Sequence, residues 1–190
     1  RGKTMHSDST DDYCISIDAD CKLDLPTDDE LLSVYRLLLL NAEHLMPWMD
    51  WVDKITFSSQ QEVIHAWRNL PQEKGFERVI YLEGKPVGAC GLRIKDSDCA
   101  EIGYWIGKEH AGQGHMTKIV RFLTDYGFMH YDLHRIEIQC AFGNERSRAI
   151  PERLGYTQEA TLRERHRLHG VYHDLVIYGM IRKEWDGLRG

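Results

Sequence analysis

The amino-acid sequence predicts an α/β protein built on one mixed β-sheet that is flanked by helices. Its 190 residues match the length of a single domain, which by size scaling buries roughly 70% of the surface of the unfolded chain. Stretches with the two-residue period of strands alternate with stretches of helical period, in the order β-α-α-β-β-β-α-β-α-β-β. This order indicates helices on the faces of a sheet that has both parallel and antiparallel pairs.

The first third of the chain is predicted to hold a tail, one strand and two helices. Residues 1–12 are polar and are expected to form a disordered tail, which leaves 13–190 as the folded domain. A strand is expected over residues 14–25. One helix then begins near Pro26, and a second has Ser59 as its N-cap.

The rest of the chain alternates more regularly. Strands are expected over residues 78–82, 87–92 and 100–106, and a helix over 117–130, where apolar residues recur at helical spacing. A strand over 135–140 follows. The C-terminal elements are a helix from Asn144 to Gly155, which suits the C′ position of a helix, and a hairpin formed by 161–168 and 171–181.

Composition excludes several classes of protein. The net charge of -6 and the pI of about 5.9 argue against a nucleic-acid-binding surface and are compatible with a cationic substrate. No apolar run is long enough to span a membrane. The five cysteines contain no Cys-x-x-Cys pair, and the ten histidines complete no zinc pattern. We expect a cytoplasmic protein without a metal, which binds neither nucleic acid nor membrane.

The most informative stretch is a strand that runs through a glycine turn into a helix. Free N–H groups at a helix start, beside Gly112 and Gly114, form a site for a phosphate or pyrophosphate. A dinucleotide fingerprint would need glycine at Thr117, and a P-loop would need lysine at His115. The loop therefore belongs to neither of these common motifs.

Three further motifs accompany the glycine turn, which reads Gly-Gln-Gly at 112–114. They are Glu-Ile-Gly-Tyr-Trp at 101–105, Asn-x-x-Ser at 144–147 and Leu-Gly-Tyr at 154–156. With this combination the chain resembles the RimJ/RimL-type branch of the GNAT superfamily of N-acetyltransferases over roughly residues 20–185. This resemblance implies the GNAT fold with splayed central strands, acetyl-CoA as donor and a primary amine as acceptor.

The resemblance also implies a binding site for acetyl-CoA. Two positions depart from the family loop, because Ala111 replaces its usual Gln or Arg and Met116 its usual Gly or Ala. Neither change removes a backbone donor. The implied ligands are Tyr104, Trp105, Ile106, Gly112, Gln113, Gly114, His115, Met116, Thr117, Asn144 and Ser147.

Two residues are implied to be catalytic. Glu101 stands at the strand start, where some members of the family carry the proton acceptor; the alternative is an ordinary strand-end carboxylate. The tyrosine that often protonates the departing thiolate is replaced by Pro151, which leaves Ser147 as the acid. The alternative role for Ser147 is that of a helix cap.

The acceptor is less defined than the donor. Trp48 and Trp51, together with Glu101, are expected to contact it, although the two tryptophans could equally belong to the core or to a dimer surface. A homodimer is expected. A protein N-terminus is favoured, because its amine has a pKa near 8 against about 10.4 for lysine. The alternatives are a small-molecule amine, or a non-catalytic acyl-CoA sensor in which Glu101 and Ser147 are dispensable.

Overall fold

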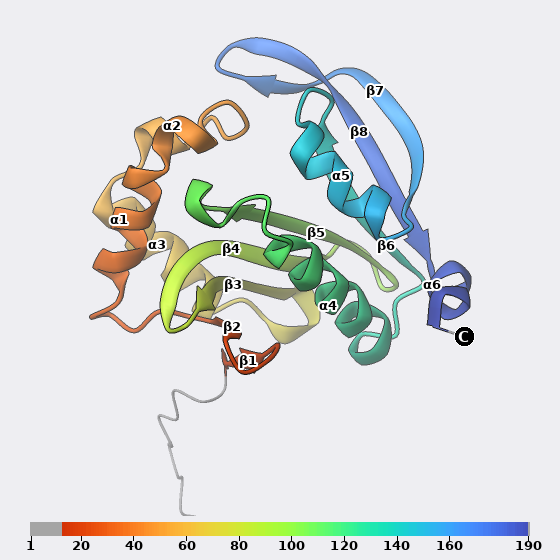
Figure 1. The fold of residues 1–190 in the computed structure, drawn as a ribbon, viewed down its shortest axis with the longest axis horizontal. Coiled ribbons are helices and arrows are strands. Elements are labelled where there is room, and N and C mark those ends of the chain that lie inside the picture. Colours follow the sequence, from red (N-terminus) through yellow and green to blue (C-terminus); the bar gives the residue numbers. More distant parts are fainter. Residues whose placement is uncertain (1–12, 190) are drawn as a thin grey trace, which may run out of the picture.

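The computed structural model describes residues 13–189, which form an eight-stranded mixed sheet with helices on both faces (Figure 1). The expected tail, 1–12, lies outside these residues. The strand order is β1-β2-β3-β4-β5-β6-β8-β7, and every neighbouring pair is antiparallel except β5 and β6. The predicted mixed sheet is thus confirmed.

The elements follow one another in the predicted order, with three additions: a second short strand at the start, the short helix α2 and the C-terminal helix α6. The strands are β1 Ile15–Ser16, β2 Cys21–Asp24, β3 Gly75–Leu82, β4 Lys85–Ile94, β5 Cys99–Ile106, β6 Arg135–Ala141, β7 Thr157–Leu168 and β8 Val171–Ile181. The helices are α1 Leu31–Leu40, α2 Ala42–Leu45, α3 Phe57–Arg68, α4 His115–His130, α5 Glu145–Arg153 and α6 Arg182–Arg189. Short 3₁₀ turns span Val52–Lys54, Gln72–Lys74 and Lys108–His110.

The prediction of one strand over residues 14–25 was wrong. Two short antiparallel strands, β1 and β2, occupy this stretch. The Asp18 carboxylate accepts hydrogen bonds from the N–H groups of Asp20 and Cys21, each at 2.8 Å, and so stabilises a tight turn.

The N-cap of α3 also differs from the prediction. Thr56 is the cap, and its hydroxyl accepts the N–H of Ser59 at 3.1 Å. The Ser59 hydroxyl in turn accepts the N–H of Thr56 at 3.0 Å. The two residues therefore form a reciprocal capping box.

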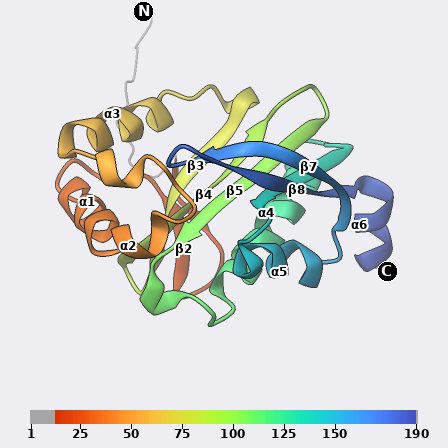
Figure 2. The same ribbon diagram turned by 90° about the horizontal axis from the view of Figure 1, so that it is seen from above.

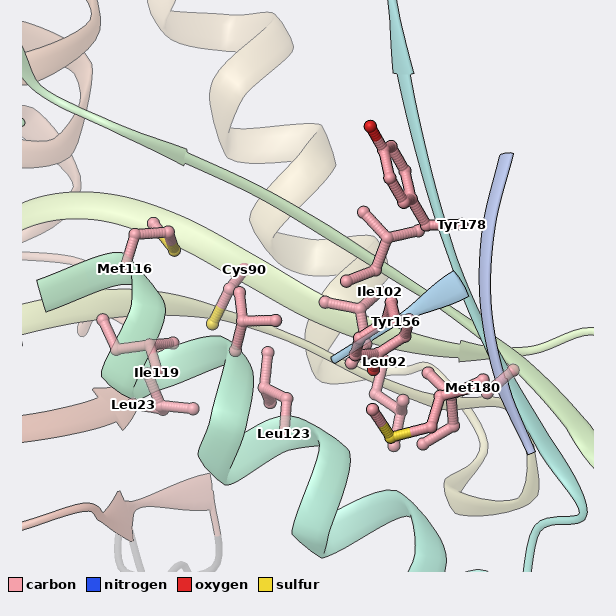
Figure 3. Close-up of a cluster of buried hydrophobic side chains, with 14 of the residues drawn as sticks. Leu23, Cys90, Leu92, Ile102, Met116, Ile119, Leu123, Tyr156, Tyr178 and Met180 are labelled. Atoms are coloured by element: carbon pink, nitrogen blue, oxygen red, sulfur yellow. The ribbon is translucent and has the colours of Figure 1, made fainter. Parts of the chain in front are cut away.

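The main core lies between the sheet and α4. Alternate strand residues point toward this helix because successive side chains of a strand lie on opposite faces. Figure 3 shows the cluster, in which Leu92 and Ile102 face Ile119 and Leu123 of α4, all at most 2% exposed.

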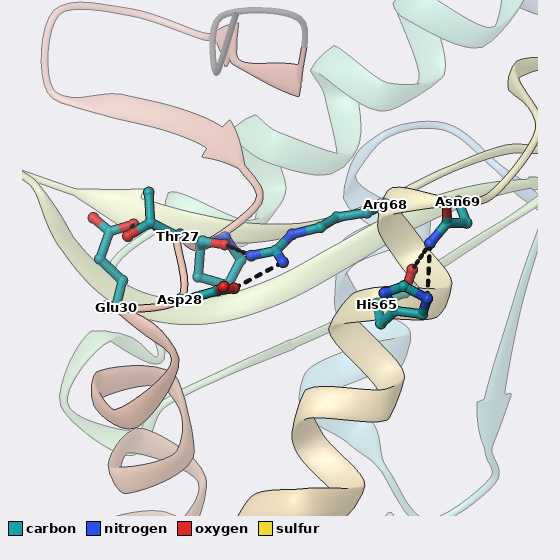
Figure 4. Close-up of polar contacts among 7 residues, drawn as sticks. Thr27, Asp28, Glu30, His65, Arg68 and Asn69 are labelled. Carbon is teal, nitrogen blue, oxygen red and sulfur yellow. Dashed lines mark hydrogen bonds and ion pairs between the residues drawn. The ribbon is translucent and has the colours of Figure 1, made fainter. Parts of the chain in front are cut away.

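Helices α1 and α3 cover part of the opposite face, over β3 (Figure 2). Val79 packs there against Val34 and Ile64. The end of α3 is tied to the segment before α1, since Arg68 forms an ion pair with Asp28 at 2.9 Å (Figure 4). Beyond these helices, the same face of the sheet is left for the site described below.

Helix α6 was missed by the sequence reasoning, which ended at the second strand of the hairpin. Few apolar residues mark it, and Trp185 is the one that anchors it. Its indole N–H donates to Asp125 at 2.7 Å, and its ring stacks on Phe128 with centroids 5.0 Å apart. Burial of one large aromatic side chain thus holds a helix whose remaining residues are mostly polar.

The hairpin of β7 and β8 has the predicted turn about Gly170 and arches back over the molecule toward α2 (Figure 1). At its tip, the ring of His169 lies 2.6 Å from the backbone oxygen of Met46. The hairpin therefore bridges two parts of the chain that are 123 residues apart.

Candidate active site

The site begins where the parallel strands β5 and β6 part. Their pairing runs from Cys99 and Arg135 to Ile102 and Ile138, and there it stops. Beyond this point β5 remains paired with β4, and β6 with β8. The backbone of residues 103–106 therefore has no partner in β6, and the predicted splay of the central strands is present.

A cleft of about 390 Å³ occupies the gap between the parted strands; we call it the donor cleft. Its walls bring together residues that lie up to 109 positions apart. Of the predicted ligands, those that line it are Tyr104, Trp105, Ile106, Gly112, Gly114, Met116, Thr117, Asn144 and Ser147.

The glycine turn at the mouth of the cleft has the geometry of an anion site. Gly112 and Gly114 have φ of +77° and +84°, which side chains rarely adopt, and no atom lies within 4 Å of the position of a Cβ. Gly114 is the N-cap of α4, whose first N–H groups have no partner within the helix. The turn is therefore open to a ligand and supplies backbone donors.

Three basic side chains surround this turn and were missed by the sequence reasoning. Lys118, Arg121 and Arg153 line a hollow of about 380 Å³ beside Gly112 and Gly114. Lys118 and Arg121 are one helical turn apart in α4, a spacing that could have revealed them. Arg153 comes from α5, so only the fold places it there.

Two predicted ligands do not line the donor cleft with their side chains. The amide of Gln113 donates to the backbone oxygen of Glu109. The ring of His115 faces that of His110, with centroids 6.3 Å apart. Met116 has two roles, because it lines the cleft and is also buried in the main core, with 6% of its surface exposed.

Asn144, and not Ser147, caps α5. The Asn144 side-chain oxygen accepts the N–H of Ser147 at 3.2 Å. The Ser147 hydroxyl is left to other partners, with Cys140 Sγ at 3.2 Å and the Tyr104 hydroxyl at 3.4 Å. It therefore lies on the cleft wall without a capping role.

Pro151 links this serine to Tyr104. In an α-helix the N–H of residue 151 would donate to the carbonyl of residue 147, but proline has no N–H. The freed carbonyl of Ser147 instead accepts the Tyr104 hydroxyl at 3.0 Å. Burial raises the pKa of Tyr104, so this hydroxyl stays protonated and available as a donor.

A second cavity, of about 750 Å³, lies on the sheet face beside α1 and α3; we call it the sheet-face cavity. Tyr104 and Trp105 line both this cavity and the donor cleft. The two spaces thus meet at one point of β5. The aromatic residues Trp51 and Trp67, together with Met49 and Val63, make the sheet-face cavity largely apolar.

The three residues predicted to contact the acceptor lie in different places. Trp51 lines the sheet-face cavity, whereas Trp48 lines the donor cleft. Glu101 lines neither; its carboxylate is paired with Arg93 at 3.2 Å and with Lys95 at 3.1 Å. A different carboxylate, Glu77, lines the sheet-face cavity, and sequence reasoning did not select it because no motif contains it.

Two further properties concern the described part of the chain. Between residues 13 and 189, no helix combines the length and apolar composition that a membrane crossing needs. Within the same residues, no three His, Cys, Asp or Glu side chains gather in a way that could hold a metal ion.

Comparison with known proteins identifies the class to which this site belongs. The model of the acetyltransferase (GNAT) domain family matches residues 22–157. That match spans the strand, the glycine turn, the Asn-x-x-Ser segment and most of the sheet. The chain belongs to the GNAT acetyltransferases, as the motifs predicted.

Individual relatives agree with this assignment. YdaF of Bacillus subtilis (strain 168), named as a ribosomal N-acetyltransferase, is 35% identical over 85% of this chain and 90% of its own. The ribosomal-protein-serine acetyltransferase of Escherichia coli (strain K12) is 23% identical, over 88% and 96%. The crystal structure of the microcin C7 self-immunity acetyltransferase MccE, in complex with acetyl-CoA and AMP, superposes with a TM-score of 0.82 at 26% identity, covering 91% and 98%.

We expect Tyr104→Phe to lower the free energy of unfolding by about 1–2 kcal/mol, because the Ser147 carbonyl then has no donor. In a Pro151→Ala background the helix can supply the missing N–H, so the same change should cost about 1 kcal/mol less. Urea unfolding of the four proteins measures this coupling. Tyr172→Phe, at an exposed position, is the control. Equal losses in both backgrounds would contradict the link through Pro151.

Proposed function

We propose that this enzyme transfers an acetyl group from acetyl-CoA to a primary amine, and that the amine is the N-terminal α-amino group of a protein. The observation that carries the proposal is the meeting of two cavities at Tyr104 and Trp105. A donor in the cleft between β5 and β6 and an acceptor in the sheet-face cavity would face each other there. Such alignment supplies much of the acceleration of a two-substrate reaction.

The residues of the donor cleft suit acetyl-CoA. Backbone N–H groups of residues 113–117 would bind the pyrophosphate, so Gln113 and His115 would contribute main-chain rather than side-chain donors. Lys118, Arg121 and Arg153 add positive charge where the phosphates would lie. The backbone edge of Tyr104, Trp105 and Ile106 that faces away from β4 would hold the thiol-bearing arm, and Asn144 lines the same cleft.

The chemistry needs an acid and a proton acceptor. The amine nitrogen bonds to the acetyl carbon, the carbon–sulfur bond breaks, and the departing thiolate takes a proton. Ser147 is the proposed acid, because its hydroxyl lies on the cleft wall and does not cap α5. The role of Glu101 as proton acceptor stays a prediction, since its carboxylate lies in two ion pairs outside both cavities.

A protein acceptor is supported by the names of relatives and by acid–base chemistry. YdaF and the E. coli enzyme are both named for ribosomal substrates. An α-amino group is neutral far more often at pH 7 than a lysine side chain, so it needs a weaker base. Trp51 would contact the acceptor, and Trp48 would border the donor.

A cytoplasmic homodimer completes the proposal. Apolar side chains on the hairpin and near the site remain exposed, which is typical of surfaces that bind another protein. These side chains are Trp51, Phe142, Leu162, Val171 and Tyr172.

Replacement of Gly114 tests the donor site. Gly114→Glu places a carboxylate against the phosphates, and the Kd for CoA should rise at least tenfold, or by about 1.4 kcal/mol, in calorimetry. Gly114→Ala separates backbone strain from charge. Gly84→Glu is the matched control, because Gly84 also has a positive φ and open surroundings, in the turn between β3 and β4. Unchanged CoA affinity in folded Gly114→Glu would exclude this site.

Replacement of Ser147 tests the acid. Ser147→Ala should lower kcat by about tenfold, because a thiol with a pKa near 8.5 needs only modest help to leave. The Kd for CoA should hold, and so should the melting temperature, since Asn144 caps the helix. Ser58→Ala, on α3 and outside both cavities, is the control. Full activity in Ser147→Ala would assign the proton to water.

A panel of acceptors tests the function itself. Thiol release from acetyl-CoA should occur with peptides that have a free N-terminus and stop when the same peptides are N-acetylated. Release only with polyamines, amino sugars or amine drugs would favour the small-molecule alternative. CoA binding without release from any acceptor would favour the non-catalytic sensor.

A further inference from the structure

A carboxylate lies flat on the floor of the sheet-face cavity because glycines make room for it. Glu77, Gly91 and Gly103 are direct neighbours across β3, β4 and β5. A Cβ at Gly91 would clash with the Glu77 carboxylate, and one at Gly103 would lie 2.8 Å from the Arg93 guanidinium. The two side chains therefore lie across the glycines, where they form an ion pair.

Glu77 is the sheltered acid of this cavity. Its side chain is 12% exposed, whereas that of Arg93 is 46% exposed. The other carboxylate in the lining is Asp50, which lies in an exposed loop. Glu101 pairs with the same Arg93 guanidinium as Glu77, but it does not line the cavity.

We propose that Glu77 binds the ammonium group of the acceptor and takes its proton. This inference rests on the proposed function and identifies the acid that serves it. One proton passes from the ammonium to the carboxylate. The neutral nitrogen then bonds to the acetyl carbon and the carbon–sulfur bond breaks. The nitrogen gives its second proton to water as the amide forms, and the thiolate takes a proton from the Ser147 hydroxyl, which water then reprotonates.

The electrostatics of Glu77 suit this role. Burial raises the pKa of its carboxyl above the ordinary value, while the charge and hydrogen bond of Arg93 act in the opposite direction. A proton acceptor works best when its pKa approaches the operating pH. The shift therefore brings this carboxylate closer to the amine in proton affinity than an exposed glutamate would be.

The charges of the cavity also select the kind of amine. Asp50 and Glu77 are balanced by Lys54 and Arg93, which line the same space. One ammonium can displace Arg93 from part of the Glu77 carboxylate, but a polycation would meet two positive charges. The surrounding tryptophans favour apolar groups beside the amine. We therefore assign this cavity to a monocationic acceptor, such as a peptide N-terminus.

The central test is Glu77→Gln. At pH 7 the kcat/KM for a peptide acceptor should fall at least 100-fold, with an unchanged KM for acetyl-CoA. The loss should shrink as the pH rises past about 8, because more of the amine is then already neutral. Glu159→Gln is the matched control: it also removes a carboxylate paired with arginine, on β7 and outside both cavities.

A second variant moves the carboxylate without removing it. Gly91→Ala should displace the Glu77 side chain and lower kcat/KM at least tenfold. Gly179→Ala is its control, because a Cβ there would lie 2.5 Å from Glu159 and so disturb the distant pair in the same way. Circular dichroism and the Kd for CoA verify that each variant is folded.

Binding separates this inference from the proposed function. A free-amine peptide should bind Glu77→Gln at least tenfold more weakly than the wild type, whereas its N-acetylated form should bind both equally. Equal affinity of the free amine for both proteins would overturn the inference. So would a pH-independent loss of rate, or a larger loss in Glu101→Gln that high pH rescues. The binding test remains decisive even if the enzyme acetylates none of the acceptors, which is the result that would contradict the proposed function.

Discussion

The parting of β5 from β6 after Ile102 is the constraint on which the rest of the site depends. Parallel pairing ends after four residue pairs, and each strand then follows its antiparallel neighbour. A sheet continuous at this point would have neither a cleft nor unpaired backbone groups. The antiparallel ladders on both sides satisfy the outer edges of β5 and β6, so the open gap is stable.

Two helix starts meet at this gap because each follows one of the parted strands. β5 leads through the glycine turn into α4, and β6 leads through Asn144 into α5. Residues at both N-termini therefore line the same cleft. Figure 1 shows the two helices following their strands. Pro151 then couples α5 back to β5, since the hydrogen bond that it cannot make is replaced by the Tyr104 hydroxyl. This hydrogen bond fixes Tyr104, which lines both cavities.

On the side of β5 that faces the sheet-face cavity, two neighbouring glycines leave space where other residues would have side chains. Gly91 and Gly103 leave a shallow floor on which Glu77 and Arg93 lie, and this adds an ion pair to a largely apolar cavity. The hairpin of β7 and β8 closes over the molecule through His169. The two cavities thus both adjoin β5. The donor cleft lies by the glycine turn beyond the end of this strand, and the sheet-face cavity lies over Gly91 and Gly103.

The sequence by itself determined the family, the mixed sheet, the glycine turn and most of the residues that line the donor cleft. These features depend on residues that are close in the chain, so the period of apolar residues or the spacing within a motif is enough to predict them. It misassigned the cap of α3 to Ser59, three residues after the actual cap Thr56, because the two neighbouring hydroxyls cap each other's N–H groups. Only the tertiary structure decided that Glu77 and Arg93 line the sheet-face cavity while Glu101 does not, and that Arg153 lies beside the glycine turn. These placements follow from strand register and helix packing, which bring together residues far apart in the chain.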